Sequence, residues 1–151
     1  MTSARRTPIW LSHHWPDQYD RCVLVGHRHV CRRCLVMYPL AFLVAGLAVA
    51  GWALPSPWSQ IALVVLPLPA LVDFVGEHRR LWAHSPRRLT WLGALQGLGL
   101  GVGFGRYLDN PADPWFWGVG ILYSSIAFVA AVTAPTTPTG STGSSGSDLT
   151  G

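Results

Sequence analysis

The chain has 151 residues, of which half are hydrophobic and only 12% are charged, with a mean hydropathy of +0.30. A soluble domain carries about 25% charged residues, so this composition argues against a soluble globular protein and indicates a chain that lies mostly in a lipid bilayer. The net charge is +4, with eleven arginines and no lysine. A basic chain can bind nucleic acid, but these arginines flank apolar segments, so we expect them to set membrane topology and expect no nucleic-acid partner.

The first 35 residues form a polar segment with many potential metal ligands. It holds all three cysteines and four of the six histidines. Tetrahedral zinc takes four Cys or His donors, usually as two close pairs separated by a loop. Cys31-x-x-Cys34 supplies one pair, and His13-His14 with Cys22 or His27 supplies the other. The sequence therefore predicts a zinc site, whose candidate ligands are His13, His14, Cys22, His27, Cys31 and Cys34.

Two other interpretations of this segment stay open. Arg32 and Arg33 would favour the thiolate form of a redox-active Cys31–Cys34 pair. Redox Cys-x-x-Cys motifs usually stand at a helix start in a βαβ fold, however, and no such pattern is present. The remaining interpretation is a solvated arm without special chemistry.

Four apolar stretches follow, each close to the roughly 20 residues that cross a hydrocarbon core as a helix. Pro55-Ser56-Pro57 gives a tight turn between the first two. The pattern predicts an all-α fold, a four-helix transmembrane bundle behind an N-terminal Cys/His segment. The predicted helices cover about residues 36–54, 58–76, 89–105 and 114–134.

The arginines predict the orientation of this bundle. Ten of the eleven lie before the first helix or between the second and third, which an even number of crossings places on one side. The positive-inside rule makes that side cytoplasmic. We therefore expect both termini in the cytoplasm, where reduced thiols remain free to bind metal.

The third apolar stretch has a row of glycines four residues apart, at Gly93, Gly97, Gly101 and Gly105. Small residues on one face let membrane helices approach closely. We expect this face to pack against another helix, either within the chain or in a homo-oligomer. The spacing does not match a phosphate-binding glycine loop.

Two acidic residues lie near the predicted cytoplasmic boundary. Asp73 and Glu77 are four residues apart and share a helix face. Acidic groups at membrane depth usually face a partner or a cavity. They are candidate acid–base residues, or candidates to orient a metal ligand. The alternative is that Asp73 pairs with one of the arginines between residues 79 and 88.

The C-terminal segment, residues 135–151, consists almost entirely of Thr, Ser, Gly and Pro. Such a composition has too little apolar surface to offset the entropy of ordering, so the sequence predicts a disordered tail.

Several of these residues carry a resemblance to a known family. Cys31, Arg33, Cys34 and Tyr38 form a Cys-x-Arg-Cys motif with a Tyr that leads into a membrane helix. Further matches are Gly26 and, before the glycine-rich helix, Asp73, Arg87 and Thr90. From about residue 12 to 105 the chain resembles the bacterial membrane proteins catalogued as domain of unknown function 2085.

The departures from this family keep or add ligands in two places. His13-His14 stands where the family has Cys-His, and Cys22 replaces a Ser. Val36 and Trp91 replace glycines. The resemblance implies a bacterial cytoplasmic-membrane protein with a cysteine-rich site, and implies no reaction. It favours His13 or His14 with Cys31 and Cys34 as ligands, leaving Cys22 and His27 as alternatives for the fourth.

Three functions are compatible with this pattern. The first is a non-enzymatic membrane protein whose metal site shapes a surface for a membrane-protein partner or for lipid. The second is a membrane enzyme in which the metal or the thiols act on a lipid-linked or redox substrate, with Asp73 or Glu77 as catalytic residue. The third, a transporter, is disfavoured because few polar groups lie inside the predicted helices.

Overall fold

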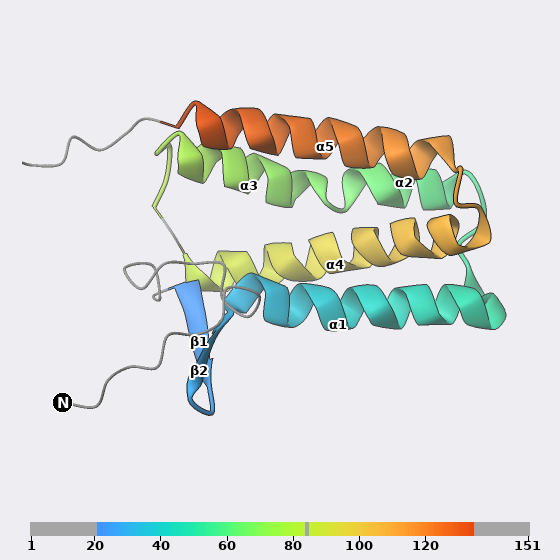
Figure 1. Ribbon diagram of the computed structural model, residues 1–151, viewed down its shortest axis with the longest axis horizontal. Helices are drawn as coiled ribbons and strands as arrows, with labels where there is room; N and C mark the ends of the chain where they lie inside the picture. Colours follow the sequence, from blue (N-terminus) through green and yellow to red (C-terminus); the bar gives the residue numbers. More distant parts are fainter. Residues whose placement is uncertain (1–20, 84, 135–151) are drawn as a thin grey trace, which may run out of the picture.

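The computed structural model describes residues 21–83 and 85–134. It is an antiparallel helical bundle with a small β-hairpin at one end (Figure 1). The predictions for His13, His14 and the tail of residues 135–151 lie outside the described residues. The elements are β1 (Cys22–Val25), β2 (Arg28–Cys31), α1 (Arg32–Leu47), the π-helical turn η2 (Ala48–Trp52), α2 (Trp58–Val65), α3 (Leu68–His78), α4 (Pro86–Asp109) and α5 (Pro114–Val132).

Three segments are long and apolar enough to cross a membrane, as expected of a multi-pass membrane protein: Arg32–Trp52, Trp58–His78 and Pro114–Val132. Large apolar side chains cover their outer surfaces; Phe42 and Phe128, for example, are 68% and 67% exposed. Lipid tails accept such a surface, whereas water does not. The composition-based prediction of membrane spans is therefore confirmed for three of the four segments.

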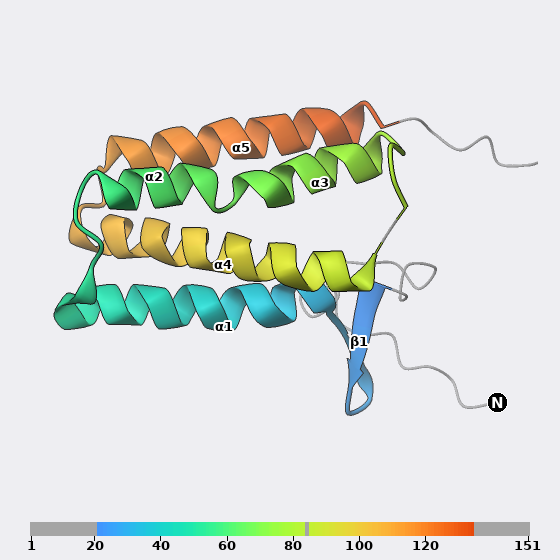
Figure 2. The same ribbon diagram turned by 180° about the vertical axis from the view of Figure 1, so that it is seen from behind.

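The fourth predicted span, α4, has the length but not the hydropathy, because six of its 24 residues are glycine. It runs alongside α1 and beside α2 and α3 in both ribbon views (Figures 1 and 2). Seven of its residues are buried against these neighbours. The helix α4 is therefore the interior helix of the bundle.

The hairpin makes the all-α prediction incomplete. β1 and β2 pair antiparallel, with Val23 opposite Val30, around a turn at Gly26 and His27. Gly26 has φ +62°, a conformation that glycine adopts without strain. The sequence does contain a hairpin signal here, because two short Val-containing runs are separated by two residues that include Gly.

The second predicted helix is divided in two. α2 ends at Val65 and α3 begins at Leu68, with Pro67 at the junction. Proline has no backbone N–H and clashes with the preceding turn, so it interrupts the helical hydrogen bonds. The two pieces still run in one direction as a single crossing (Figure 2).

Two helix boundaries differ from the prediction in ways that matter for function. α1 begins at Arg32, so Cys34 lies inside a helix and not in a polar arm. α4 continues to Asp109, so Arg106 is helical as well. Polar residues at helix ends are hard to assign from hydropathy, which finds only the apolar centre of each segment.

The glycine row of α4 packs against α1 of the same chain. A Cβ atom on Gly97 would lie 2.6 Å from the carbonyl oxygen of Met37, and one on Gly101 would lie 2.7 Å from that of Ala41. Gly93 and Gly105 make similar approaches to Arg33 and Ala48. Of the two predicted partners, the structure therefore places the intrachain one on this face, and α1 occupies the surface proposed for a homo-oligomer.

A second glycine pair faces the kinked crossing. A Cβ atom on Gly99 would lie 2.6 Å from the Pro67 ring, and one on Gly103 would lie 2.9 Å from Leu63. The helix α4 is thus held closely on two sides, and the absence of a side chain at these glycines allows the approach.

Replacing Gly97 by Ala should destabilise the bundle. The added methyl group has no room beside Met37, and overpacking of this kind costs about 1–3 kcal/mol. The measurement is the thermal unfolding midpoint in detergent. Gly118→Ala in α5 is the matched control, because nothing lies within 4 Å of its Cβ position. Helix propensity alone would make both substitutions mildly stabilising, so equal behaviour of the two variants would contradict the packing argument.

Candidate functional site

The hairpin and the start of α1 bring the three cysteines together. Cys22 and Cys31 are direct partners in the antiparallel register. Cys31 is also the N-cap of α1, and Cys34 is its third residue. The Cys34 thiol is within hydrogen-bonding reach of Cys31 and within electrostatic reach of Cys22. Cys22 and Cys31 are buried, Cys34 is half-buried, and all three are free thiols.

The histidines of the hairpin are placed differently from one another. His27 is exposed in the turn, at the far end of the ladder from Cys22 and Cys31. Three residues lie between His27 and Cys31, which puts the two about 13 Å apart along the ladder, so the hairpin does not bring His27 to the thiols. His29, which was not among the predicted ligands, lies two residues before Cys31 and so faces the same side of the hairpin. The two-residue strand period was the signal that could have found it.

Zinc itself remains a prediction. Among residues 21–83 and 85–134, no group of three or more His, Cys, Asp or Glu side chains is arranged to hold a metal ion. The imidazoles predicted to complete the set, His13 and His14, lie outside the described residues.

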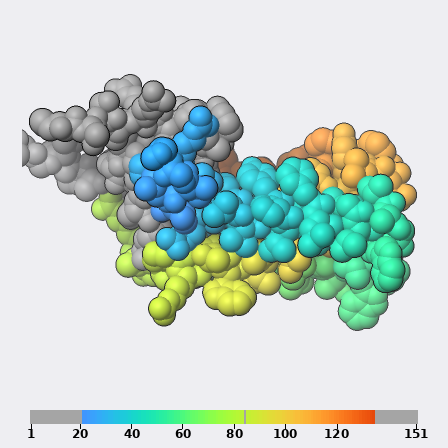
Figure 3. Space-filling model, turned by 90° about the horizontal axis from the view of Figure 1, so that it is seen from below, coloured from blue at the N-terminus to red at the C-terminus, as the bar shows by residue number. Residues whose placement is uncertain are grey.

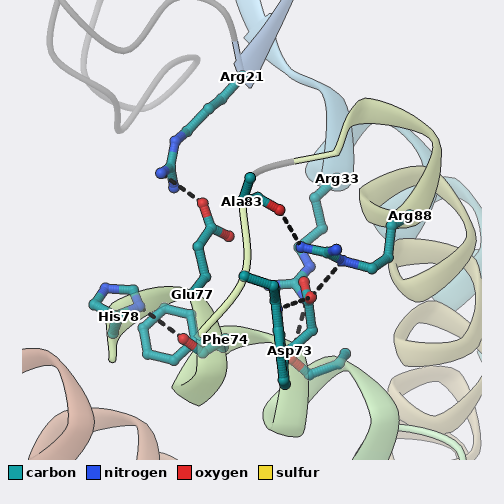
Figure 4. A network of polar contacts seen from close by, with 10 residues as sticks. Arg21, Arg33, Asp73, Phe74, Glu77, His78, Ala83 and Arg88 are labelled. Carbon is teal, nitrogen blue, oxygen red and sulfur yellow. Dashed lines mark hydrogen bonds and ion pairs between the residues drawn. The ribbon is translucent and has the colours of Figure 1, made fainter. Parts of the chain in front are cut away.

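Asp73 is the centre of a polar network at the same end of the bundle (Figure 4). Its side chain is buried, and Oδ1 lies 2.6 Å from Nε of Arg88. The indole Nε1 of Trp82 donates a hydrogen bond of 3.0 Å to the same oxygen. Arg88 lies over the Trp82 ring, 5.8 Å from its centroid. The alternative in which Asp73 pairs with an arginine between residues 79 and 88 is therefore confirmed, with Arg88 as the partner.

A glycine makes room for this arrangement. A Cβ atom at position 76 would lie 2.0 Å from the Trp82 ring. The indole can therefore reach Asp73 only because Gly76 has no side chain. The sequence offered no sign of this contact, because Trp82 lies between the second and third predicted helices, outside either helical pattern.

Glu77 and Arg33 connect the network to the hairpin and α1. Glu77 forms an ion pair of 2.5 Å with Arg21, the residue before β1. Arg33 donates a hydrogen bond of 3.1 Å to the carbonyl oxygen of Ala70. Its guanidinium is within electrostatic reach of Asp73, Glu77, Cys31 and Cys34. The thiols and the two acidic residues thus belong to one polar centre, with Arg33 between them.

The ion pairs of Asp73 and Glu77 bear on the catalytic roles predicted for these two residues. Asp73 is 4% exposed, and its carboxylate is held by Arg88 and Trp82. A carboxylate held in this way fastens helices α3 and α4 together. Catalytic roles for Asp73 and Glu77 stay predictions.

A second polar centre lies at the opposite end of the bundle. Arg106 of α4 pairs with Asp113 through Nε and donates a hydrogen bond of 2.7 Å from Nη1 to the hydroxyl of Ser59. Asp113 also caps α5, accepting a hydrogen bond of 3.0 Å from the backbone N–H of Trp115. The hydrogen bond from Arg106 holds the pKa of Asp113 below its ordinary value. The carboxylate therefore stays ionised at neutral pH.

The chain matches no family model, and neither the curated proteins nor the solved structures contain a match. The resemblance to the domain of unknown function 2085 family therefore remains a prediction.

Replacing Arg88 by Met should destabilise the protein, because Asp73 would keep a buried charge without its cation. We expect a loss of about 2 kcal/mol, below the range for fully buried pairs, since 34% of the Arg88 side chain is exposed. Unfolding in detergent measures this loss.

Two further variants make the Arg88 test specific. Adding Asp73→Asn to Arg88→Met should restore part of the stability, since the unpaired charge is then removed. Arg87→Met is the matched control, because Arg87 is exposed and should tolerate the change. A double variant no more stable than Arg88→Met would refute the charge argument.

The Asp113→Asn variant should lose stability in a pH-dependent way. Asparagine retains the helix cap but removes the charge, a loss on the order of 1–3 kcal/mol at neutral pH. Because the folded-state pKa of Asp113 is depressed, its contribution is present above the unfolded value of about 3.9 and disappears as the pH falls through the folded value. Unfolding midpoints of both proteins from pH 7 to pH 3 should therefore converge in acid, and a constant difference would exclude this ion pair as the cause.

Proposed function

We propose that the protein is a multi-pass membrane protein whose three-thiol cluster, with an imidazole from His13 or His14, binds a zinc ion that fixes the N-terminal segment to the bundle. The observation that carries the proposal is the convergence of Cys22, Cys31 and Cys34 from a hairpin and a helix start. Among the described residues the three thiols are not arranged to hold a metal ion, so the proposal requires both the imidazole and a closer approach of the thiols when the ion binds. His27 takes no part in it, because it lies at the hairpin tip.

The surroundings of the thiols support a structural role for the ion. Cys22 and Cys31 are 8% and 3% exposed, which suits a closed site better than one that must admit substrate. Arg33 provides positive charge beside the thiolates that zinc requires. The ion pair between Arg21 and Glu77 already joins the hairpin to α3. A metal ion would extend this fastening to residues before Arg21 and present a fixed surface to a partner or to lipid headgroups.

The proposed topology places this site in the cytoplasm. Among the described residues there are nine arginines, and eight of them lie at one end of the bundle: just before or within the hairpin, at the start of α1 or α4, or after α3. The ninth, Arg106, lies at the other end. By the positive-inside rule the hairpin end faces the cytoplasm of a bacterial inner membrane.

A second candidate function is reversible dithiol chemistry. Cys31 is the N-cap of α1 and Cys34 lies in its first turn. Their thiols are in hydrogen-bonding reach of each other. The oxidised form would be a Cys31–Cys34 disulfide, with two protons and two electrons passing to a disulfide or quinone acceptor. The burial of Cys31 makes this the weaker candidate.

Metal analysis of the full chain, purified anaerobically in detergent with reductant, tests the zinc site. The expected content is close to one zinc ion per chain. It should be lost in Cys31→Ser and Cys34→Ser and in the His13→Ala/His14→Ala pair. His27→Ala is the matched control and should retain the metal.

Thiol labelling completes the same experiment. A membrane-impermeant maleimide should modify Cys34 only after cells are opened and the metal is chelated, as expected for a cytoplasmic metal-bound thiol. Wild-type protein without stoichiometric metal would refute the zinc site. If mild oxidation of that metal-free protein then gives a Cys31–Cys34 disulfide, the dithiol function replaces it. Labelling of intact cells would overturn the topology.

A further inference from the structure

A cavity of about 610 Å³ opens at the end of the bundle away from the cysteines. It lies between η2, the connection from η2 to α2, and the last turns of α4 with the start of the α4–α5 turn. In the space-filling view this end of the molecule is formed by η2 and the following connection beside the end of α4 and the start of α5 (Figure 3). Its volume is within the range of small-molecule sites, about 300–1,000 Å³.

One wall of the cavity is apolar. It is formed by Val44, Leu47, Trp52, Leu54 and Leu108. Trp52 is 81% exposed and Leu54 is 51% exposed. These side chains stand at the end of a membrane span, at the depth where acyl chains meet headgroups. This wall therefore suits a hydrocarbon chain better than a water-soluble ligand.

The lining also includes a polar wall, which carries one positive and two negative side chains. Arg106 and Asp113 form the ion pair described above, and Asp109 stands one turn along α4 from Arg106. Asp109 is exposed, and among the described residues it has no ion-pair partner. Ser59 and Asn110 add neutral hydrogen-bonding groups. The polar wall thus has a net negative charge, and the guanidinium of Arg106 is its one positive group among the described residues.

We propose that this cavity binds a zwitterionic phospholipid with a primary-amine headgroup, phosphatidylethanolamine. Its phosphate would accept hydrogen bonds from Arg106, and its ammonium would donate to Asp109 and Asp113. Its acyl chains would lie along the wall of Val44, Leu47 and Trp52. The net negative charge of the polar wall disfavours anionic lipids, and phosphatidylglycerol in addition lacks an ammonium that could pair with the carboxylates. The site is independent of the zinc proposal, because no cysteine or histidine of the described residues lines it.

Lipid titration of the delipidated full chain in detergent, followed by native mass spectrometry, tests the assignment. The probes are phosphatidylethanolamine, phosphatidylcholine and phosphatidylglycerol with identical acyl chains. We expect the first to bind most tightly. Phosphatidylcholine should bind more weakly because its quaternary ammonium donates no hydrogen bond, and phosphatidylglycerol should be weakest. Equal binding of all three, or a preference for phosphatidylglycerol, would overturn the proposal.

Three variants locate the site. Asp109→Asn should weaken phosphatidylethanolamine binding roughly tenfold, the factor that corresponds to one lost charge-assisted hydrogen bond, and should leave phosphatidylcholine nearly unchanged. Asp109→Glu is the matched control and should retain the preference. Ala53→Trp, at an exposed lining position, should reduce binding of every lipid by filling the cavity. Unaltered lipid preference in Asp109→Asn would show that the headgroup binds elsewhere.

Unfolding measurements keep the test independent of folding. Phosphatidylethanolamine should raise the unfolding midpoint of the wild type more than that of Asp109→Asn, while the lipid-free midpoints stay equal because Asp109 is exposed. An equal rise in both proteins would again place the lipid outside this cavity.

Discussion

The close approach of α4 to α1 is the constraint on which the rest of the molecule depends. Lipid provides no hydrophobic force between helices, so their association relies on backbone proximity and packing. The glycines at positions 93, 97, 101 and 105 allow that proximity along nearly the whole length of α1. Gly99 and Gly103 provide it for the kinked crossing of α2 and α3. A helix with low hydropathy can therefore occupy the centre of an otherwise lipid-facing bundle.

This central helix also connects the two polar ends. Its first turn carries Arg88, which holds Asp73 of α3. Its last turns carry Arg106, which holds Asp113 at the start of α5 and Ser59 of α2. Ion pairs at both ends fix the register of α4 against its neighbours, while the glycines between them fix its distance. The thiol cluster is positioned by the same arrangement, because Gly93 packs on Arg33 and Arg33 reaches Asp73 and the cysteines.

The two ends have different chemistry as a result. The hairpin end combines thiols, arginines and buried acids, and suits a site that fastens a segment of chain. The other end combines an apolar wall with a net negative polar wall, and suits the headgroup of a lipid. Both sites lie at the boundaries of the spans, where water can solvate charge and where polar residues cost least. The interior between them is almost wholly apolar or glycine.

The sequence by itself determined the membrane class, three of the spans and the glycine face, because hydropathy and residue spacing are local properties of the chain. It offered an arginine partner for Asp73 as one alternative, and the tertiary structure selected Arg88. The hairpin was also encoded locally, in the Val-containing runs around Gly26. Tertiary structure alone decided that α1 covers the glycine face, that Trp82 reaches Asp73 across Gly76, and that the hairpin separates His27 from the thiols. It also made Arg106, Asp109 and Asp113 the wall of a cavity. These outcomes depend on which helices become neighbours, and that choice is made by packing between residues far apart in the chain.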